Sequence, residues 1–92
     1  MPAALRETVT HRITVLNAND TVRFEFHGLL DPAALASLEA AVAFARRSGA
    51  PVRVVLRSGT EVDRSIVPEL RNLDVTLDVE SPYLARWLAR EH

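Results

Sequence analysis

The chain has 92 residues, of which 48% are apolar and 25% charged, with a formal net charge of -1. A chain of this length supports one domain with a single modest core, and its near-neutral charge gives no electrostatic basis for binding nucleic acid or an acidic membrane. Cysteine is absent, which excludes disulfides, thiolate catalysis and sulfur-ligated metals. All eleven basic residues are Arg, which indicates a GC-rich, bacterial coding sequence.

The opening residues, MPAALRET, lack the basic start and the long apolar core of a secretion signal. No apolar run approaches the roughly 20 residues that span a bilayer. We therefore expect a cytoplasmic protein without membrane insertion. Residues 1–92 are expected to form one domain, in which residues 1–6 are a flexible lead-in because nothing in them favours a helix or a strand.

Two runs with a period of two predict a β-hairpin at the start of the domain. The inward positions of the first run are Val9, His11, Ile13 and Val15. The second run places Val22, Phe24 and Phe26 on one face and Arg23, Glu25 and His27 on the other. This period is typical of strands with one buried and one wet face. The Asn and Asp residues at 17–20 predict the turn, and Gly28 is expected to end the second strand.

A capped helix is predicted directly after this hairpin. Asp31 is placed to accept the free N–H groups of the first turn, and Pro32 suits the first helical position. The apolar stripe has spacings of three and four residues and consists of Leu35, Leu38, Val42 and Ala45. Gly49 is expected to close the helix in a left-handed conformation, before Pro51.

Residues 52–57, VRVVLR, predict a third strand, with Val52, Val54 and Leu56 on one face and Arg53, Val55 and Arg57 on the other. A strand, a helix and a strand joined by short loops normally place the two strands parallel. Residues 58–61 are predicted to form a loop.

A short second helix is predicted at residues 66–73, with Ser65 as its N-cap and Pro68 tolerated in its first turn. Residues 75–80 alternate and predict a fourth strand. Ser81 and Pro82 then begin a last helix, whose apolar stripe is Leu84, Trp87 and Leu88.

The predicted order is β-β-α-β-α-β-α, so we expect an α/β fold with a four-stranded mixed sheet and helices packed on one face. The strands alternate instead of forming continuous apolar runs, which indicates that the other face is open. On that face Arg53 and Arg57 are expected between carboxylates of the neighbouring strands. The alternative fold is a ferredoxin-like α+β sandwich, which the early turn at residues 17–20 disfavours.

Three stretches of the chain resemble the STAS family, the sulfate-transporter and anti-sigma-factor-antagonist domains. FEFHGLLDPAALASLEAAV is similar to the family's alternating strand, its Gly, its Leu-Asp pair and its amphipathic helix. VRVVLRSGTEVDRSIVPEL is similar to its third strand, loop and second-helix start, and VTLDVESPYLARWL to its last strand and final helix. The resemblance covers nearly the whole chain from Ile13 and implies a STAS-like fold and a non-enzymatic, regulatory protein-interaction module.

The resemblance also points to the start of the second helix. In the family, a serine that directly follows an Asp there is phosphorylated by a partner kinase in the antagonist branch. Here Asp63 is kept, Arg64 occupies the phosphoacceptor position, and Ser65 comes one place later. This implies a module that is not switched by phosphorylation. Its candidate partner-binding residues are Asp63, Arg64, Ser65 and Glu69, although Asp63 or Ser65 can instead be explained as a helix cap.

The partner implied by the resemblance is an anti-sigma-type kinase, a lipid-transport ATPase or a stress-signalling complex. The alternative function is a self-associating structural subunit, because the first strand, residues 8–16, is an edge strand with few charges. We predict no enzyme activity, cofactor or metal. His11, His27 and His92 show no ligand spacing, and the sequence contains no phosphate-binding loop or nucleophile motif. Trp87 is expected in the core.

Overall fold

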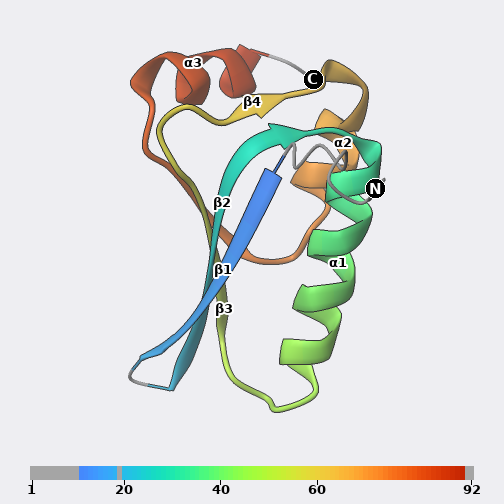
Figure 1. The fold of residues 1–92 in the computed structure, drawn as a ribbon, viewed down its shortest axis with the longest axis vertical. Coiled ribbons are helices and arrows are strands. Elements are labelled where there is room, and N and C mark those ends of the chain that lie inside the picture. Colours follow the sequence, from blue (N-terminus) through green and yellow to red (C-terminus); the bar gives the residue numbers. More distant parts are fainter. Residues whose placement is uncertain (1–10, 19, 91–92) are drawn as a thin grey trace, which may run out of the picture.

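The computed structural model describes residues 11–18 and 20–90 (Figure 1). The predicted lead-in at residues 1–6, the beginning of the predicted first strand at residues 7–10, and His92 lie outside the described residues. In chain order the elements are β1 (His11–Ala18), β2 (Thr21–Leu30), α1 (Pro32–Arg46), β3 (Val52–Leu56), β4 (Glu61–Val62), the 3-10 turn η2 (Arg64–Ile66), α2 (Val67–Arg71), β5 (Thr76–Val79) and α3 (Pro82–Arg90).

A mixed sheet with the strand order β1-β2-β3-β5 forms the frame of the domain. β1 and β2 pair antiparallel, with Ile13 opposite Phe26 and Val15 opposite Phe24. The other two neighbouring pairs, β2 with β3 and β3 with β5, are parallel. The predicted α/β class, the mixed sheet, the hairpin and the parallel pairing of the strands on either side of α1 are therefore confirmed.

Several strand ends differ from the prediction. β3 ends at Leu56, one residue before the predicted end, and β5 covers Thr76–Val79 instead of residues 75–80. β1 and β2 pair as far as Ala18 and Thr21, so the turn is tighter than the predicted residues 17–20. Asp20 adopts a φ of 66°, which Asp tolerates better than most residues. The prediction that Gly28 ends the second strand is wrong. β2 bends at Gly28, where φ is 116°, and continues to Leu30, because a glycine can take this φ without leaving the strand.

β4 is a short strand inside a region that we predicted to be a loop. Its residues Glu61–Val62 pair in parallel with Leu29–Leu30, beyond the bend of β2. The N–H of Asp63 donates to the carbonyl of Leu30 at 2.9 Å and extends this contact. The predicted loop at residues 58–61 is thus wrong in its last residue, since two residues are too few to show a period. β4 places the start of the second helical segment beside the end of β2.

α1 begins and ends as predicted. The Oδ1 atom of Asp31 accepts a hydrogen bond from the N–H of Ala34 at 2.9 Å, and Pro32 occupies the first turn. Gly49 follows the helix with a φ of 81°. The buried residues of the helix include the whole predicted stripe and face β2 and β3; they are Ala34, Leu35, Leu38, Val42 and Ala45.

The second helical segment covers residues 64–71, so it starts and ends two residues earlier than the predicted residues 66–73. It begins with η2, for which the side chain of Asp63 accepts a hydrogen bond from the N–H of Ser65 at 2.9 Å. α2 then covers only Val67–Arg71, with Pro68 in its first turn. The prediction that Ser65 is the cap is wrong, because the Asp63 carboxylate already accepts at this turn and α2 itself has no side-chain cap.

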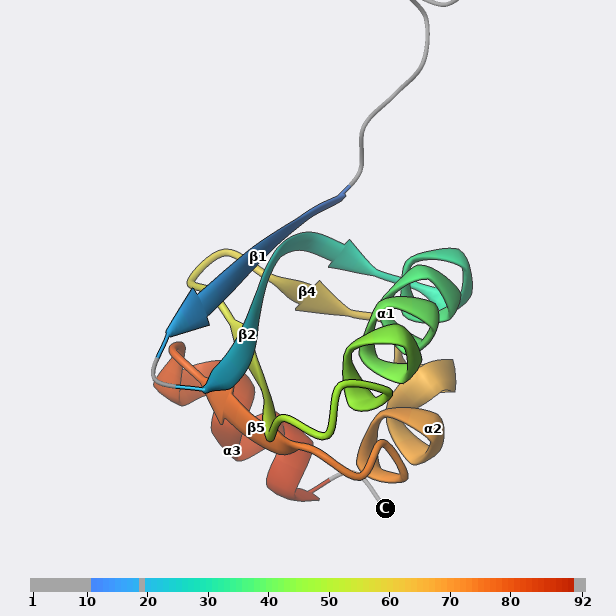
Figure 2. The same ribbon diagram turned by 90° about the horizontal axis from the view of Figure 1, so that it is seen from below.

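α1 and α2 lie on one side of the sheet, and α3 lies across the end at which the parallel strands finish (Figures 1 and 2). The Oγ atom of Ser81 accepts a hydrogen bond from the N–H of Leu84 at 3.2 Å, which confirms the predicted start of α3. Leu84 and Leu88 are buried in the core cluster that β2, β3, α1 and α2 also share. Trp87 is half-buried and packs against that cluster, as the apolar stripe predicted.

Candidate functional site

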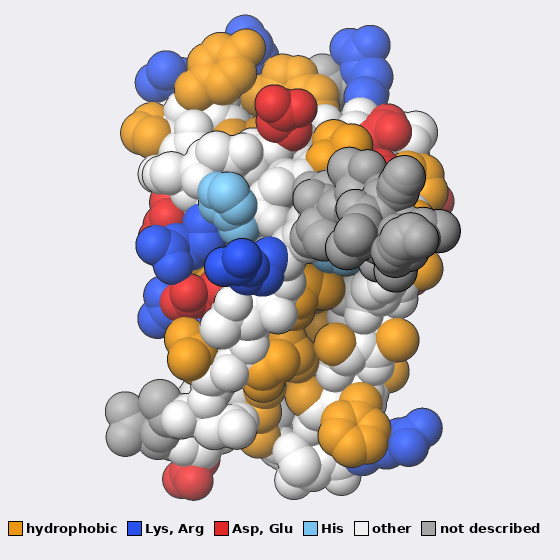
Figure 3. Space-filling view, viewed as in Figure 1, with side chains coloured by type: hydrophobic (Ala, Val, Ile, Leu, Met, Phe, Trp, Pro, Cys, Tyr) orange, Lys and Arg blue, Asp and Glu red, His pale blue; other side chains and the backbone are white. Residues whose placement is uncertain are grey.

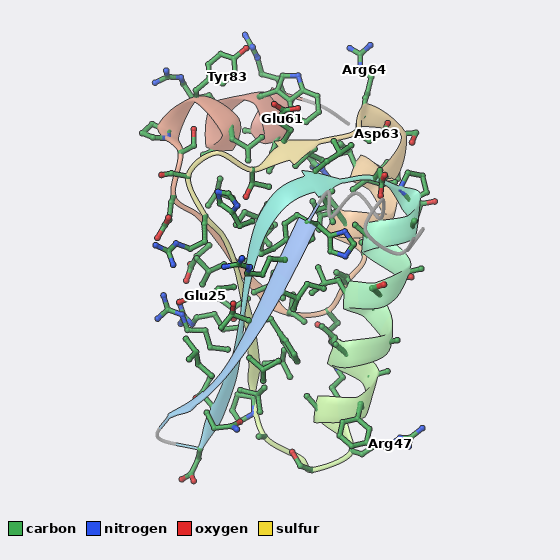
Figure 4. All side chains as sticks on the ribbon, in the orientation of Figure 1. Glu25, Arg47, Glu61, Asp63, Arg64 and Tyr83 are labelled. Atoms are coloured by element: carbon green, nitrogen blue, oxygen red, sulfur yellow. The ribbon has the colours of Figure 1, made fainter. Side chains whose placement is uncertain are left out.

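The four predicted partner-binding residues lie around η2 and the start of α2. Arg64, Ser65 and Glu69 are exposed, and Asp63 is half-buried. Figure 4 shows Arg64 pointing away from the molecule at one end of its long axis, with Asp63 behind it and closer to the sheet. The structure therefore brings the four residues together on one segment, which we call the η2 surface. Three of them project into solvent.

The η2 surface is held in place by main-chain contacts on both sides of Asp63. Its N–H donates to the Leu30 carbonyl at 2.9 Å, and its carbonyl accepts from the N–H of Ile66 at 3.1 Å. The Ser65 N–H, and with it the Ser65 side chain, lowers the pKa of the Asp63 carboxyl below its usual value. Asp63 is thus an ionised cap at neutral pH. Asp63 is therefore a helix cap, and it also belongs to the candidate site, since the cap fixes the direction of the main chain that carries Arg64 and Ser65.

The open face of the sheet carries a lattice of ion pairs. Arg57, directly after β3, donates to Glu25 at 2.8 Å and to Glu80 at 2.9 Å, one carboxylate from each neighbouring strand region. Arg53 contacts Asp78 on β5. The prediction that the Arg side chains lie between carboxylates is confirmed for Arg57. Arg53 has its carboxylate on the β5 side, while its register partner on β2 is Arg23. Val55 lies on this face between the register partners Glu25 and Asp78 and is only 3% exposed.

The charges of this lattice are stabilised by one another. The N–H of Ser58 and then the Arg57 guanidinium lower the pKa of the Glu80 carboxyl, and the Glu80 and Glu25 carboxylates raise the pKa of Arg57. Arg23 also contacts Glu25 at 3.1 Å. Because these side chains already have partners of opposite charge, the face is balanced, as the sequence indicated for the open side of the sheet.

The two histidines in the described residues lie on opposite faces of the hairpin. The ring of His11 stacks on Phe26 on the core side, with centroids 5.7 Å apart and planes 8° apart. His27 is exposed on the open face. The described residues hold no group of three His, Asp or Glu side chains placed to bind a metal ion. Glu25 and Asp31, which are candidate carboxylates by type, are engaged with arginines and with the α1 N-terminus.

A second surface was not found by sequence reasoning. Phe44 is 73% exposed and Val15 is 53% exposed, and both line an open apolar groove of about 380 Å³ between β1 and α1. We call it the β1–α1 groove; its lining residues are Val15, Asn17, Val22, Phe24, Ala41, Phe44, Ala45 and Ser48. The available signal was Phe44 itself, a large apolar residue that falls outside the stripe of α1. Tyr83 on α3 is also exposed, at 71%.

No family model and no curated protein matches this chain. None of the helices between residues 11 and 90 is long and apolar enough to cross a membrane. The STAS resemblance therefore stays a prediction that rests on the quoted stretches of sequence. What the geometry adds is two surfaces, the exposed η2 surface and the β1–α1 groove, at different places on one fold.

Proposed function

We propose that the protein is a non-enzymatic, STAS-like regulatory module that binds a protein partner through the η2 surface. The observation that carries this proposal is the Asp63-capped turn, which holds Arg64 and Ser65 outward at the end of the molecule (Figure 4). A rigid turn loses little conformational entropy when a partner binds it, so preorganised side chains contribute to affinity at low cost.

The charges of the η2 surface support a polar docking point. Arg64 offers a guanidinium that can bind a carboxylate in a bidentate manner, and Glu69 on α2 offers the opposite charge. Two opposite charges at fixed positions select a complementary partner and disfavour others. On the open sheet face, five side chains form ion pairs with one another, which favours a structural role for them; they are Glu25, Arg53, Arg57, Asp78 and Glu80.

The module is proposed to act without a phosphorylation switch, because Arg64 stands where the family has its phosphoacceptor serine. By the resemblance, the partner class is an anti-sigma-type kinase, a transporter ATPase or a signalling complex, and the compartment is the cytoplasm. Arg64 cannot accept a phosphoryl group as an ester, and its positive charge differs in sign from a phosphoserine. The surface therefore presents one constant charge pattern to its partner.

The test compares capture of partners by three tagged forms of the full chain from the native host: wild type, Arg64→Glu and Arg47→Glu. Arg47 is also exposed, and it lies at the opposite end of the molecule, which makes it a matched control for charge reversal (Figure 4). We expect a distinct protein that wild type and Arg47→Glu capture equally and that Arg64→Glu loses. Equal capture by all three folded proteins would refute docking through the η2 surface.

A second candidate function is a self-associating subunit. It is favoured by the exposed edge of β1 together with the apolar residues Val15 and Phe44 beside it. This candidate uses a different surface from the first, so the two functions are separable by experiment.

A further inference from the structure

β1 is an edge strand with an unusually open outer side. It pairs with β2 on one side, and no described residue pairs with it on the other. β1 has eight residues, whereas the opposite edge strand β5 has four. In an antiparallel ladder about half of the N–H and C=O groups of an edge strand point outward. Such edges are usually protected by several charges, a proline or a bulge, and β1 has a single arginine, Arg12, and a continuous register.

The helices bury the core-side face of β2, but they leave the same face of β1 partly exposed. α1 packs against β2 and β3. Phe24 on β2 is 2% exposed, but its register partner on the same side, Val15 on β1, is 53% exposed. Leu16, on the other face of β1, is 42% exposed. Figure 3 shows hydrophobic side chains in the valley between β1 and α1.

The β1–α1 groove adds a large apolar side chain to this edge. Phe44 projects from α1 and is 73% exposed, next to Val15 and the half-buried Val22. An aromatic side chain is stabilised when a core or an interface buries it, and an exposed phenyl ring lacks this stabilisation. The edge of the sheet and the groove together form one continuous surface of unpaired main chain and exposed apolar side chains.

We propose that this surface binds a second copy of the chain, with the two β1 strands paired antiparallel across a two-fold axis at Thr14. The two sheets then form one continuous sheet with the helices α1 and α2 of both copies on the same side. The proposal gives the second candidate function a specific interface, and it does not depend on docking through the η2 surface.

The sequence of β1 is self-complementary in this register. Thr14 lies opposite its own copy, and Ile13 lies opposite Val15 of the second copy, on the side where Phe44 lines the groove. Arg12 lies opposite Leu16, so its aliphatic stem can cover the exposed leucine. Threonine pairs and pairs of β-branched residues are favourable across antiparallel strands. Centring the axis on Val15 would instead pair Ile13 with Asn17, and centring it on Ile13 would shorten the overlap to five residues.

The charges of β1 also permit this register. Seven paired residues per strand span about 24 Å, and the two copies of Arg12 come four positions apart, at about 14 Å. This separation exceeds the screening length of about 8 Å at physiological ionic strength, so the repulsion between them is small. β1 contains no carboxylate, so no other register of the two strands would gain an ion pair between Arg12 and the β1 strand of the second copy.

The test is sedimentation of the full chain over about a hundredfold range of concentration. We expect the mean mass of the wild type to rise from one chain to two. Thr14→Arg places like charges directly opposite each other and should raise the dissociation constant at least about tenfold. In one chain the substitution is tolerated, because Thr14 is exposed and its register partner is Glu25. Phe44→Ser should also weaken the dimer.

Charge pairing gives the sharpest readout. Thr14→Arg and Thr14→Glu should each be mostly monomeric, and a mixture of the two should form a dimer again. Thr76→Glu is the control, since Thr76 is exposed on the other edge strand opposite Arg53, and it should dimerise as the wild type does.

Several outcomes would overturn the proposal. The proposal is wrong if the wild type stays monomeric over the whole concentration range. It is also wrong if the wild type dimerises and Thr14→Arg leaves the dissociation constant unchanged. If a variant lacking residues 2–10 dimerises while the full chain does not, those residues cover the edge instead. If a monomeric wild type captures another protein that Thr14→Arg loses, the occupant is a foreign strand. Arg64→Glu should leave the dimer intact, so failure of either function can be recognised separately.

Discussion

His11 is the residue whose environment fits its chemistry least well. Its Nδ1 atom is buried and has no hydrogen-bond partner among residues 11–18 and 20–90, while its ring stacks on Phe26. A buried polar atom without a partner costs free energy that an apolar residue of similar shape would not lose. The period of two predicted that His11 faces inward, and it could not reveal that the ring nitrogen lacks a partner there.

We therefore predict that His11→Phe stabilises the domain. The phenyl ring keeps the stacking on Phe26 and removes the unsatisfied nitrogen, so the free energy of unfolding should rise by about 1 kcal/mol. The measurement is urea denaturation at a concentration where the chain is monomeric. His27→Phe is the control, because His27 is exposed on the other face and its replacement should bring no gain. A lower midpoint for His11→Phe would show that Nδ1 contributes favourably.

At the scale of elements, the bend of β2 at Gly28 connects the main sheet to β4. Beyond the bend, Leu29–Leu30 pair with Glu61–Val62, and this pairing positions the turn that bears Arg64. A φ of 116° is rarely adopted by residues with a side chain. The geometry of the η2 surface thus depends on one glycine more than 30 residues earlier in the sequence.

Gly28→Ala is predicted to lower the free energy of unfolding by about 1 to 3 kcal/mol, the usual cost of a strained backbone conformation. Denaturation by urea measures this loss. Gly49→Asn is the comparison, since nothing lies within 4 Å of the position of its new Cβ atom and asparagine tolerates a positive φ. The loss there should be clearly smaller. Equal losses at the two positions would contradict a special role for the bend.

The elements that the sequence predicted well are those whose periodic pattern extends over many residues and those with a clear N-cap. The hairpin, α1 with its Asp31 cap, and the Ser81 start of α3 are all confirmed. β4 was missed because its two residues show no period, and η2 was missed because Asp63 rather than Ser65 caps the turn. Which residue caps a turn depends on the course of the main chain before it. Here that course depends on the pairing of β4 with β2, a contact between residues far apart in sequence.

The same limit applies to surfaces at the scale of the molecule. The candidate residues Asp63 to Glu69 could be placed on one segment from the sequence, because they are local. The β1–α1 groove is lined by both Val15 and Phe44, and whether they share a groove depends on how far α1 reaches across the sheet. Periodicity shows which face of its element a side chain lies on. It does not show how much of that face a neighbouring helix or strand buries.

The stability of the whole molecule should fall at acidic pH through two carboxyls in particular. Hydrogen bonds from Ser65 lower the pKa of Asp63 below its ordinary value of 3.8, and those from Ser58 and Arg57 lower that of Glu80 below 4.5. A lowered pKa in the folded state means that the stabilisation is fully present above the ordinary value. It is lost as the pH falls through that value and then through the folded-state pKa.

We therefore predict that the urea midpoint is constant between about pH 7 and pH 5 and decreases below about pH 4.5. The double variant Asp63→Asn and Glu80→Gln should be less stable than the wild type at pH 7 and should lose less between pH 7 and pH 3. Added salt should leave most of this difference, because the leading cause at each carboxyl is a hydrogen bond from a main-chain N–H. An equal acid loss in the variant and the wild type would assign the pH dependence to other groups.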